Sequence, residues 1–146
     1  MRRLWTEPRS SHAGQFVNFS GVLSYPKPVS STGIPVWFGG ESAAALRRVA
    51  EYGDGWLGFK LMPAEAAAKI RRVEELLRAN RRQRSEVTLS VSPYTEPITR
   101  DDLTRYRDAG VEEVALLLHG RPRGEADMIA ALEAVARDFV EPAAKL

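Results

Sequence analysis

The glycine pair Gly39-Gly40 is the feature of this sequence best suited to bind an anion. An apolar run from Ile34 to Phe38 precedes the pair, and Ser42 opens a helix-forming segment after it. This pattern predicts a buried strand, a turn without side chains and the start of a helix. Free backbone N–H groups and the helix dipole at such a start attract phosphate. The alternative is a strand–helix connection whose glycines only permit close packing.

The composition excludes several classes of function. With 146 residues, 44% of them apolar and 27% charged, the chain is long enough for one folded domain. A net charge of +2 gives no case for a nucleic-acid or membrane partner. The absence of cysteine excludes disulfides and a cysteine nucleophile, and no His, Asp and Glu have the spacing of metal ligands. Without a signal peptide or a long apolar run, we expect a soluble, cytoplasmic protein.

Apolar periodicity predicts four strand–helix units after an irregular segment over residues 1–33, all within one domain over 1–146. The expected strands cover 35–38, 55–59, 87–92 and 111–118. The expected helices cover 42–52, 63–80 and 99–109, and a last helix carries an apolar stripe of Met128, Ile129, Leu132, Val135 and Phe139. Ser42 and Thr99 are the predicted N-caps, and Gly53 and Gly110 the predicted glycines after the helix ends.

Strands that alternate with helices over short connections predict an α/β fold with parallel strands and right-handed crossovers. Two architectures fit this pattern: a small doubly wound sheet, or half of an eight-stranded (β/α) barrel. In both, ligands bind at the carboxyl ends of the strands. This places one set of residues near a common edge: Gly39, Gly40, Phe59, Ser92 and His119.

Several motifs, taken together in their order and spacing, resemble the luciferase-like monooxygenase family. The motifs are Pro26-Lys27-Pro28, Pro35 to Ser42 and Ala50 to Trp56, supported by Leu4 to Glu7, Gly14 to Phe16 and Ala109 to Val114. The resemblance covers nearly the whole chain but only the C-terminal half of the family's pattern. It implies that the four units are the fifth to eighth of a (β/α)8 TIM-type barrel.

The resemblance also implies a cofactor, either reduced flavin mononucleotide (FMN) or the deazaflavin F420. In such proteins the cofactor supplies the hydride transfer or oxygen activation, and the protein binds and orients it. The implied phosphate contacts are Gly39 and Gly40, with the backbone N–H groups of Glu41 and Ser42 beside them. Much of the family's catalytic surface belongs to the first four units, so no catalytic residue is assigned.

Five other polar or aromatic residues have a structural and a functional interpretation. We expect Asp54 to cap a turn rather than to act in catalysis, and Trp56 to lie in the core rather than against a flavin ring. The hydroxyls of Ser90 and Ser92 are expected to face the barrel lumen, within reach of a ligand. His119 is a candidate acid or base at the end of the last strand.

The remaining basic residues have simpler explanations. Arg121 and Arg123 either attract an anionic cofactor tail or belong to a solvated loop. The arginine run suits a helix C-terminus, where cations complement the dipole: Arg78, Arg81, Arg82 and Arg84. His12 receives no role.

Three hypotheses follow for the whole chain. The first is part of a flavin- or F420-dependent oxidoreductase, whose other half comes from a separate N-terminal half or from sequence upstream of Met1. The second is a non-catalytic module that binds a phosphate-bearing ligand and completes a barrel by homodimerisation. The third is an unrelated open α/β domain.

Overall fold

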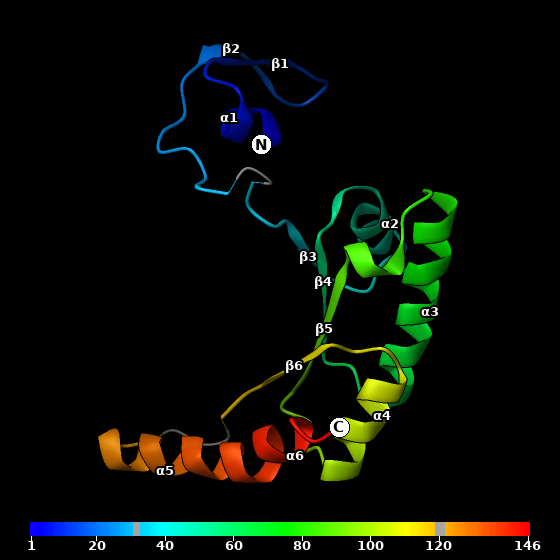
Figure 1. The fold of residues 1–146 in the computed structure, drawn as a ribbon, viewed down its shortest axis with the longest axis vertical. Coiled ribbons are helices and arrows are strands. Elements are labelled where there is room, and N and C mark those ends of the chain that lie inside the picture. The colour runs from blue at the N-terminus through cyan, green and yellow to red at the C-terminus, as the bar shows by residue number, and fades with distance from the viewer. Residues whose placement is uncertain (31–32, 119–121) are drawn as a thin grey trace. The chain divides into compact units, whose positions relative to one another are not determined.

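The structure is a computed structural model that describes residues 1–30, 33–118 and 122–146. The chain divides into two compact units, Met1–Pro35 and Val36–Leu146. Figure 1 shows the elements of each unit as a ribbon. The boundary lies close to the end of the N-terminal segment that the sequence predicts.

The N-terminal unit holds a short helix, α1 (Arg2–Thr6), and an antiparallel hairpin of β1 (Ser10–Ala13) and β2 (Asn18–Val22). The Gly14 N–H closes the hairpin turn by donating to Asn18 Oδ1 at 3.0 Å. The Lys27 ammonium donates to two carbonyls at the end of α1, those of Leu4 and Glu7. The unit therefore has more regular structure than the irregular segment predicted for residues 1–33. The prediction of one domain over 1–146 stays a prediction.

The C-terminal unit repeats a strand followed by a helix, as the sequence predicts. The elements run β3 (Trp37–Gly39), α2 (Ala43–Tyr52), β4 (Gly55–Phe59), α3 (Pro63–Ala79), η1 (Arg84–Glu86), β5 (Thr88–Tyr94), α4 (Arg100–Asp108), β6 (Glu113–Leu116), α5 (Glu125–Val135), η2 (Ala136–Val140) and α6 (Glu141–Ala143). Among the described residues, none of these helices is long and apolar enough to cross a membrane.

The order of the strands distinguishes between the two predicted architectures. The sheet runs β3-β4-β5-β6, and all three pairings are parallel. Each strand pairs with the next one along the chain, as in a (β/α) barrel, whereas a doubly wound sheet reverses its strand order at a switch point. The unit is therefore built as half of such a barrel, with β3 and β6 at the two edges.

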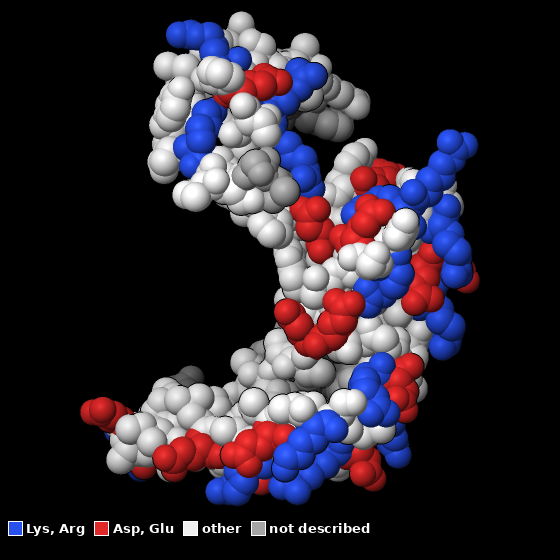
Figure 2. Space-filling model, viewed as in Figure 1, with Lys and Arg blue, Asp and Glu red and all other residues white. Residues whose placement is uncertain are grey.

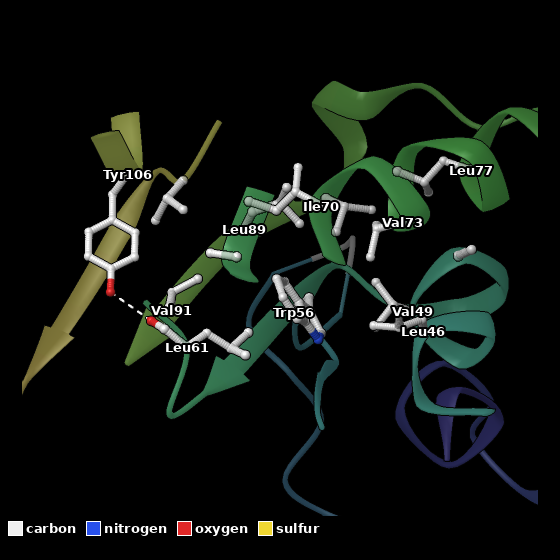
Figure 3. Packing of buried hydrophobic residues seen from close by; sticks show 14 residues of the cluster. Leu46, Val49, Trp56, Leu61, Ile70, Val73, Leu77, Leu89, Val91 and Tyr106 are labelled. Carbon is white, nitrogen blue, oxygen red and sulfur yellow. Dashed lines mark hydrogen bonds between the residues drawn. The ribbon is translucent and has the colours of Figure 1, made fainter. Parts of the chain in front are cut away.

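The core lies between one face of this sheet and the helices (Figure 3). Trp56, Leu89 and Val91 point from the strands toward Val49 and Ile70 of α2 and α3, and all five side chains are almost fully buried. Burial of each such side chain contributes about 1.5–3 kcal/mol to folding. Because side chains alternate across a strand, the opposite face carries a separate set of residues.

The predicted helix caps are confirmed, with one correction. Ser42 Oγ accepts from the Ala45 N–H at 3.2 Å, and Gly110 follows α4 with a left-handed φ of +87°. Gly53, in contrast, ends α2 with φ −80°. A Cβ on Gly53 would come within 2.9 Å of the Val49 carbonyl oxygen. Glycine is thus required there by close packing, and not by a left-handed backbone such as the one that Gly110 adopts.

The last helix leaves three of the five residues of its predicted apolar stripe exposed. α5 ends at Val135 and buries none of its residues. Met128, Ile129 and Leu132 are 40%, 48% and 51% exposed. Val135, at the end of the helix, is only partly exposed and lines a pocket with Leu116 of β6, so the uncovered apolar surface belongs to the first part of α5.

Candidate functional site

The glycine turn joins the carboxyl end of β3 to α2. Gly39 is the last residue of β3. Gly40 adopts a φ of +99°, a backbone conformation that residues other than glycine rarely adopt. The Gly40 N–H donates to the carbonyl of Leu57 at 3.4 Å, which attaches the turn to β4. The turn thus lies at the edge of the sheet where parallel α/β folds bind ligands.

Three long-range hydrogen bonds hold this turn in place. The indole Nε1–H of fully buried Trp56 donates to the Gly40 carbonyl at 3.0 Å. Glu41 Oε1 accepts from the Phe59 N–H at 2.7 Å, at the end of β4. Lys69, on α3, donates from Nζ to the Glu41 carbonyl at 3.3 Å. The conformation of the turn is therefore set by β4 and α3 before any ligand arrives.

Gly39 and Ser42 are exposed at the turn. A Cβ on Gly39 would touch the Leu57 carbonyl oxygen at 3.9 Å, and one on Gly40 would touch the Ala45 Cβ at 3.6 Å, so neither position is crowded. The first N–H groups of a helix have no acceptor within the helix, and in α2 Ser42 caps that of Ala45. The helix dipole and the Lys69 ammonium add favourable charge. This arrangement is chemically able to bind a phosphate group.

Aromatic side chains occupy the face of the sheet that the helices leave uncovered. Trp37 lies across Gly55, so that any side chain at position 55 would collide with the indole. The rings of Phe59 and Tyr94 meet at 4.7 Å between centroids, and the two residues are 49% and 41% exposed. These two residues end β4 and β5 at the same edge as the glycine turn.

Ser90 and Ser92 are buried on β5, with 4% and 8% exposure. Ser92 Oγ donates to the Ala115 carbonyl at 2.9 Å and accepts from the Tyr94 N–H at 3.2 Å. It spans the irregularity in register between β5 and β6. The Ser92 hydroxyl therefore serves the sheet, and the prediction that it reaches a ligand receives no support.

Trp56 takes the core position that the sequence predicts, whereas Asp54 has a structural contact of longer range than the predicted cap of its own turn. Asp54 Oδ2 accepts from the Val36 N–H at 2.8 Å, just before β4 begins. This is the amino end of the sheet, opposite to the glycine turn. Trp56 belongs to the core, but its hydrogen bond to Gly40 also connects it to the candidate site.

The two predicted candidates of the last loop, His119 and Arg121, lie outside the described residues. Arg123 opens α5, where its N–H donates to Asp127 Oδ2 at 3.1 Å. The ring of His12 lies 5.9 Å from that of Phe19 in the N-terminal unit.

Two residues of the arginine run secure helix C-termini. Arg82 Nη1 donates to the Val49 and Ala50 carbonyls of α2 at 3.2 and 3.3 Å. Arg84 Nη2 donates to the carbonyl of Gly110, after α4, at 2.9 Å. These contacts agree with a structural role for the run. Along α3, positive and negative side chains alternate on the face shown in Figure 2.

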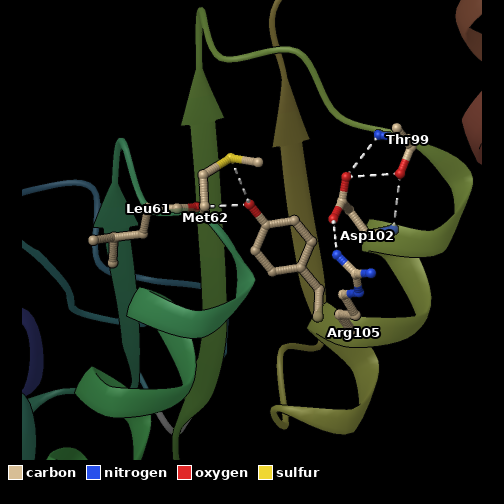
Figure 4. A network of polar contacts seen from close by, with 6 residues as sticks. Leu61, Met62, Thr99, Asp102 and Arg105 are labelled. Atoms are coloured by element: carbon tan, nitrogen blue, oxygen red, sulfur yellow. Dashed lines mark hydrogen bonds and ion pairs between the residues drawn. The ribbon is translucent and has the colours of Figure 1, made fainter.

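The clearest pKa shifts in the molecule belong to helix packing. Burial, followed by the charges of Asp102 and Glu65, raises the pKa of Tyr106 to about 12. The Tyr106 hydroxyl donates to the Leu61 carbonyl at 2.6 Å (Figure 3). Hydrogen bonds from the backbone N–H and then the hydroxyl of Thr99 lower the pKa of Asp102 (Figure 4). Both groups belong to α4, away from the glycine turn.

Sequence reasoning missed two contributors to the turn, Lys69 and the carboxylate of Glu41. Lys69 is 28 residues away from its partner, Glu41. Phe59, which the Glu41 carboxylate holds, is 18 residues away from it. A local pattern carries no signal for such contacts. Among the described residues, no group of His, Asp and Glu could hold a metal ion.

Comparison with known proteins identifies relatives of this chain. A curated, uncharacterized protein of Mycobacterium tuberculosis is 31% identical over 134 residues, which cover 90% of this chain and 44% of the relative. An uncharacterized protein of Mycobacterium bovis matches to the same extent. The chain thus spans less than half the length of these relatives.

Two solved structures share the fold. The coenzyme F420-dependent tetrahydromethanopterin reductase of Methanopyrus kandleri has a TM-score of 0.74 at 12% identity, covering 95% of this chain and 59% of that one. The monooxygenase RslO1 of Streptomyces bottropensis has a TM-score of 0.70 at 13% identity, covering 96% and 57%. The fold of this chain therefore corresponds to about half of a TIM-barrel enzyme.

The model of one protein family, the luciferase-like monooxygenases, matches residues 1–144. The match includes the glycine turn and all of the described strands. The chain therefore belongs to the luciferase-like monooxygenase family.

Proposed function

We propose that this chain supplies the phosphate-binding half of a flavin- or F420-dependent oxidoreductase site. Gly39 and Gly40 let the cofactor phosphate approach the turn closely, and the backbone N–H groups of Glu41 and Ser42 bind it. The observation that carries this proposal is the turn itself. Gly39 and Ser42 are exposed at the carboxyl edge of the sheet, and buried Trp56 holds Gly40, which has a positive φ.

The charges around the turn fit a phosphate. The Glu41 carboxylate accepts the Phe59 N–H and has the Lys69 ammonium near its own backbone carbonyl. Glu41 thus positions the turn with its side chain and offers only its N–H to a ligand. Ser42 plays a parallel part, because its hydroxyl caps α2 while its backbone lies at the start of the helix.

A bound flavin or F420 supplies the redox chemistry: hydride transfer or, for a reduced flavin, oxygen activation. The residues of this chain bind the phosphate end, orient the molecule along the carboxyl edge of the sheet and cover it with the aromatic face of Phe59 and Tyr94. Membership in the family and the F420-dependent reductase of similar fold support this class of cofactor.

Fluorescence titration of the full chain with FMN and with F420 tests the proposal. A Gly39→Val variant places a branched side chain where the phosphate would sit, while its Cβ meets no atom of the chain closer than 3.9 Å. We expect saturable binding of FMN or F420 by the wild type, competition by inorganic phosphate, and at least about tenfold weaker binding by Gly39→Val. The melting temperature should stay unchanged.

Gly124→Val is the matched control, because the space around Gly124 is open and its φ of 172° suits any residue. It should bind like the wild type. The proposed phosphate-binding site would be overturned if neither cofactor bound the wild-type chain, or if Gly39→Val bound the cofactor as tightly as the wild type.

A second candidate function is a module that binds a phosphate-bearing ligand without catalysis. The contacts at the turn favour it, because the Glu41 carboxylate and the Ser42 hydroxyl are both engaged in hydrogen bonds to backbone N–H groups. Turnover assays with reduced cofactor, with and without an N-terminal half supplied, discriminate between the candidates. Turnover in either assay excludes the non-catalytic module, and tight binding without turnover in both supports it.

A further inference from the structure

We propose that a second copy of this chain docks on the open sides of the C-terminal unit, and that the two copies close an eight-stranded parallel barrel around a two-fold axis. This inference goes beyond phosphate binding at the glycine turn and does not depend on cofactor binding. It rests on the strand edges, the uncovered stripe of α5 and the charges of two helices.

The two edges of the sheet are complementary for such closure. Within the described residues, β3 pairs only with β4, and β6 pairs only with β5. Each edge therefore presents N–H and C=O groups that can pair with another strand. A half-turn about an axis along the strands keeps all strands parallel and brings β6 of one copy beside β3 of the other. The same contact then occurs twice, which closes the ring.

The exposed stripe on α5 is explained by this arrangement. In a (β/α) barrel, helices surround the sheet and bury their apolar stripes against the strands. The strand beyond β6 is absent from the unit, and Met128, Ile129 and Leu132 are left about half exposed. In the two-copy barrel that strand is β3 of the second copy, which the α5 stripe would cover.

Charge complementarity favours a second copy over another partner. α5 carries three acidic residues and no basic one, the acidic residues being Glu125, Asp127 and Glu133; Figure 2 shows acidic side chains along this helix. α2 carries Arg47 and Arg48 against the single acidic residue Glu51. These two helices are neighbours only when α5 of one copy packs beside α2 of the other. Opposite charges then meet at both seams, which favours the correct register and association.

Closure would also enclose the aromatic face of the sheet. Trp37, Phe59, Tyr94 and Leu117 are each 41–49% exposed in the single chain. In the barrel these side chains would fill a common lumen, and two glycine turns would lie at the same mouth.

Sedimentation velocity tests this interface. We expect the wild type to sediment at twice the 16.2 kDa chain mass. A double substitution in the stripe, Ile129→Asp with Leu132→Asp, should give monomers. Ala68→Asp is the control, because Ala68 is exposed on α3, which follows an inner strand and not one of the two edge strands. It should remain dimeric.

Reversing the charges on α2 and α5 distinguishes a loss of the dimer interface from a loss of folding. Arg47→Glu with Arg48→Glu should weaken the dimer by at least about tenfold in dissociation constant. Adding Glu125→Lys with Glu133→Lys to the same chain should restore it, because the charges again oppose. All four side chains are exposed, so circular dichroism should stay unchanged. A monomeric wild type, a dimer that survives the stripe substitutions, or a charge exchange without rescue would overturn the inference.

Discussion

Trp56 is the residue that connects the core to the glycine turn. Its ring is fully buried among the strands and helices, and its Nε1–H reaches the Gly40 carbonyl at 3.0 Å. A buried carbonyl without its donor costs about 1–3 kcal/mol. One side chain thus stabilises the fold and also holds the left-handed conformation that opens the turn.

Trp56→Phe should therefore lower the free energy of unfolding by about 2–3 kcal/mol, because it leaves a cavity and an unpaired carbonyl. Urea denaturation measures the loss. Trp37→Phe is the control, since Trp37 is 42% exposed on the uncovered face; its cost should stay below about 1 kcal/mol. Equal costs for the two variants would contradict the role assigned to Trp56.

Asp102 predicts a dependence of stability on pH. Because Thr99 lowers the pKa of this carboxyl in the folded state, folding favours the charged form. Its contribution is present above the unfolded-state pKa of about 3.9 and disappears as pH falls through the lower folded-state pKa. Asp102→Asn should flatten the loss of stability below about pH 4, as thermal melts at pH 7 and pH 3 would show.

Asp101→Asn is the matched control for this experiment, because Asp101 is an exposed acid in the same first turn of α4. It removes the same charge from the helix N-terminus without touching the bonds to Thr99. If Asp102→Asn lost as much stability at low pH as the wild type, the Thr99–Asp102 cap would not govern the pH dependence of stability.

At the scale of the elements, local signals predicted the repeating pattern well. The strand–helix alternation, the Ser42 and Thr99 caps and the glycine after α4 follow from residues within a few positions of one another. Gly53 shows the limit of such reasoning, since its packing against Val49 and Phe38 involves a strand 15 residues away. The contact that holds α1 could not be predicted, because Lys27 is 23 and 20 residues away from its partners Leu4 and Glu7.

The glycine after α4 gives a prediction for element stability. Gly110 has φ +87°, and its N–H and that of Val111 donate to the Arg107 and Tyr106 carbonyls. Gly110→Ala should therefore lower the free energy of unfolding by about 1 kcal/mol or more, because alanine is strained in the left-handed region. Gly124→Ala, at an extended and open position, should change it by less than about 0.5 kcal/mol. Chemical denaturation measures the free energy of unfolding of both variants. Equal losses would contradict the role assigned to the left-handed backbone of Gly110.

At the scale of the whole molecule, the C-terminal unit has the topology of half a barrel. Four sequential parallel strands, helices on one face and aromatic residues on the other all follow from that topology. The sequence predicted the position of the candidate site through the glycine pair and the resemblance carried by its neighbours. It could not predict the support from Glu41 and Lys69, because those contacts form only when β4 and α3 fold against the turn.

Binding of the cofactor phosphate at the glycine turn is tested residue by residue by the amide chemical shifts of the ¹⁵N-labelled full chain, recorded while FMN or F420 is added. We expect the largest changes on Gly39, Gly40, Glu41 and Ser42 and on the first turn of α2. We also expect inorganic phosphate alone to move the same signals. Changes confined to other parts of the chain, or none at saturating ligand, would contradict phosphate binding at this turn.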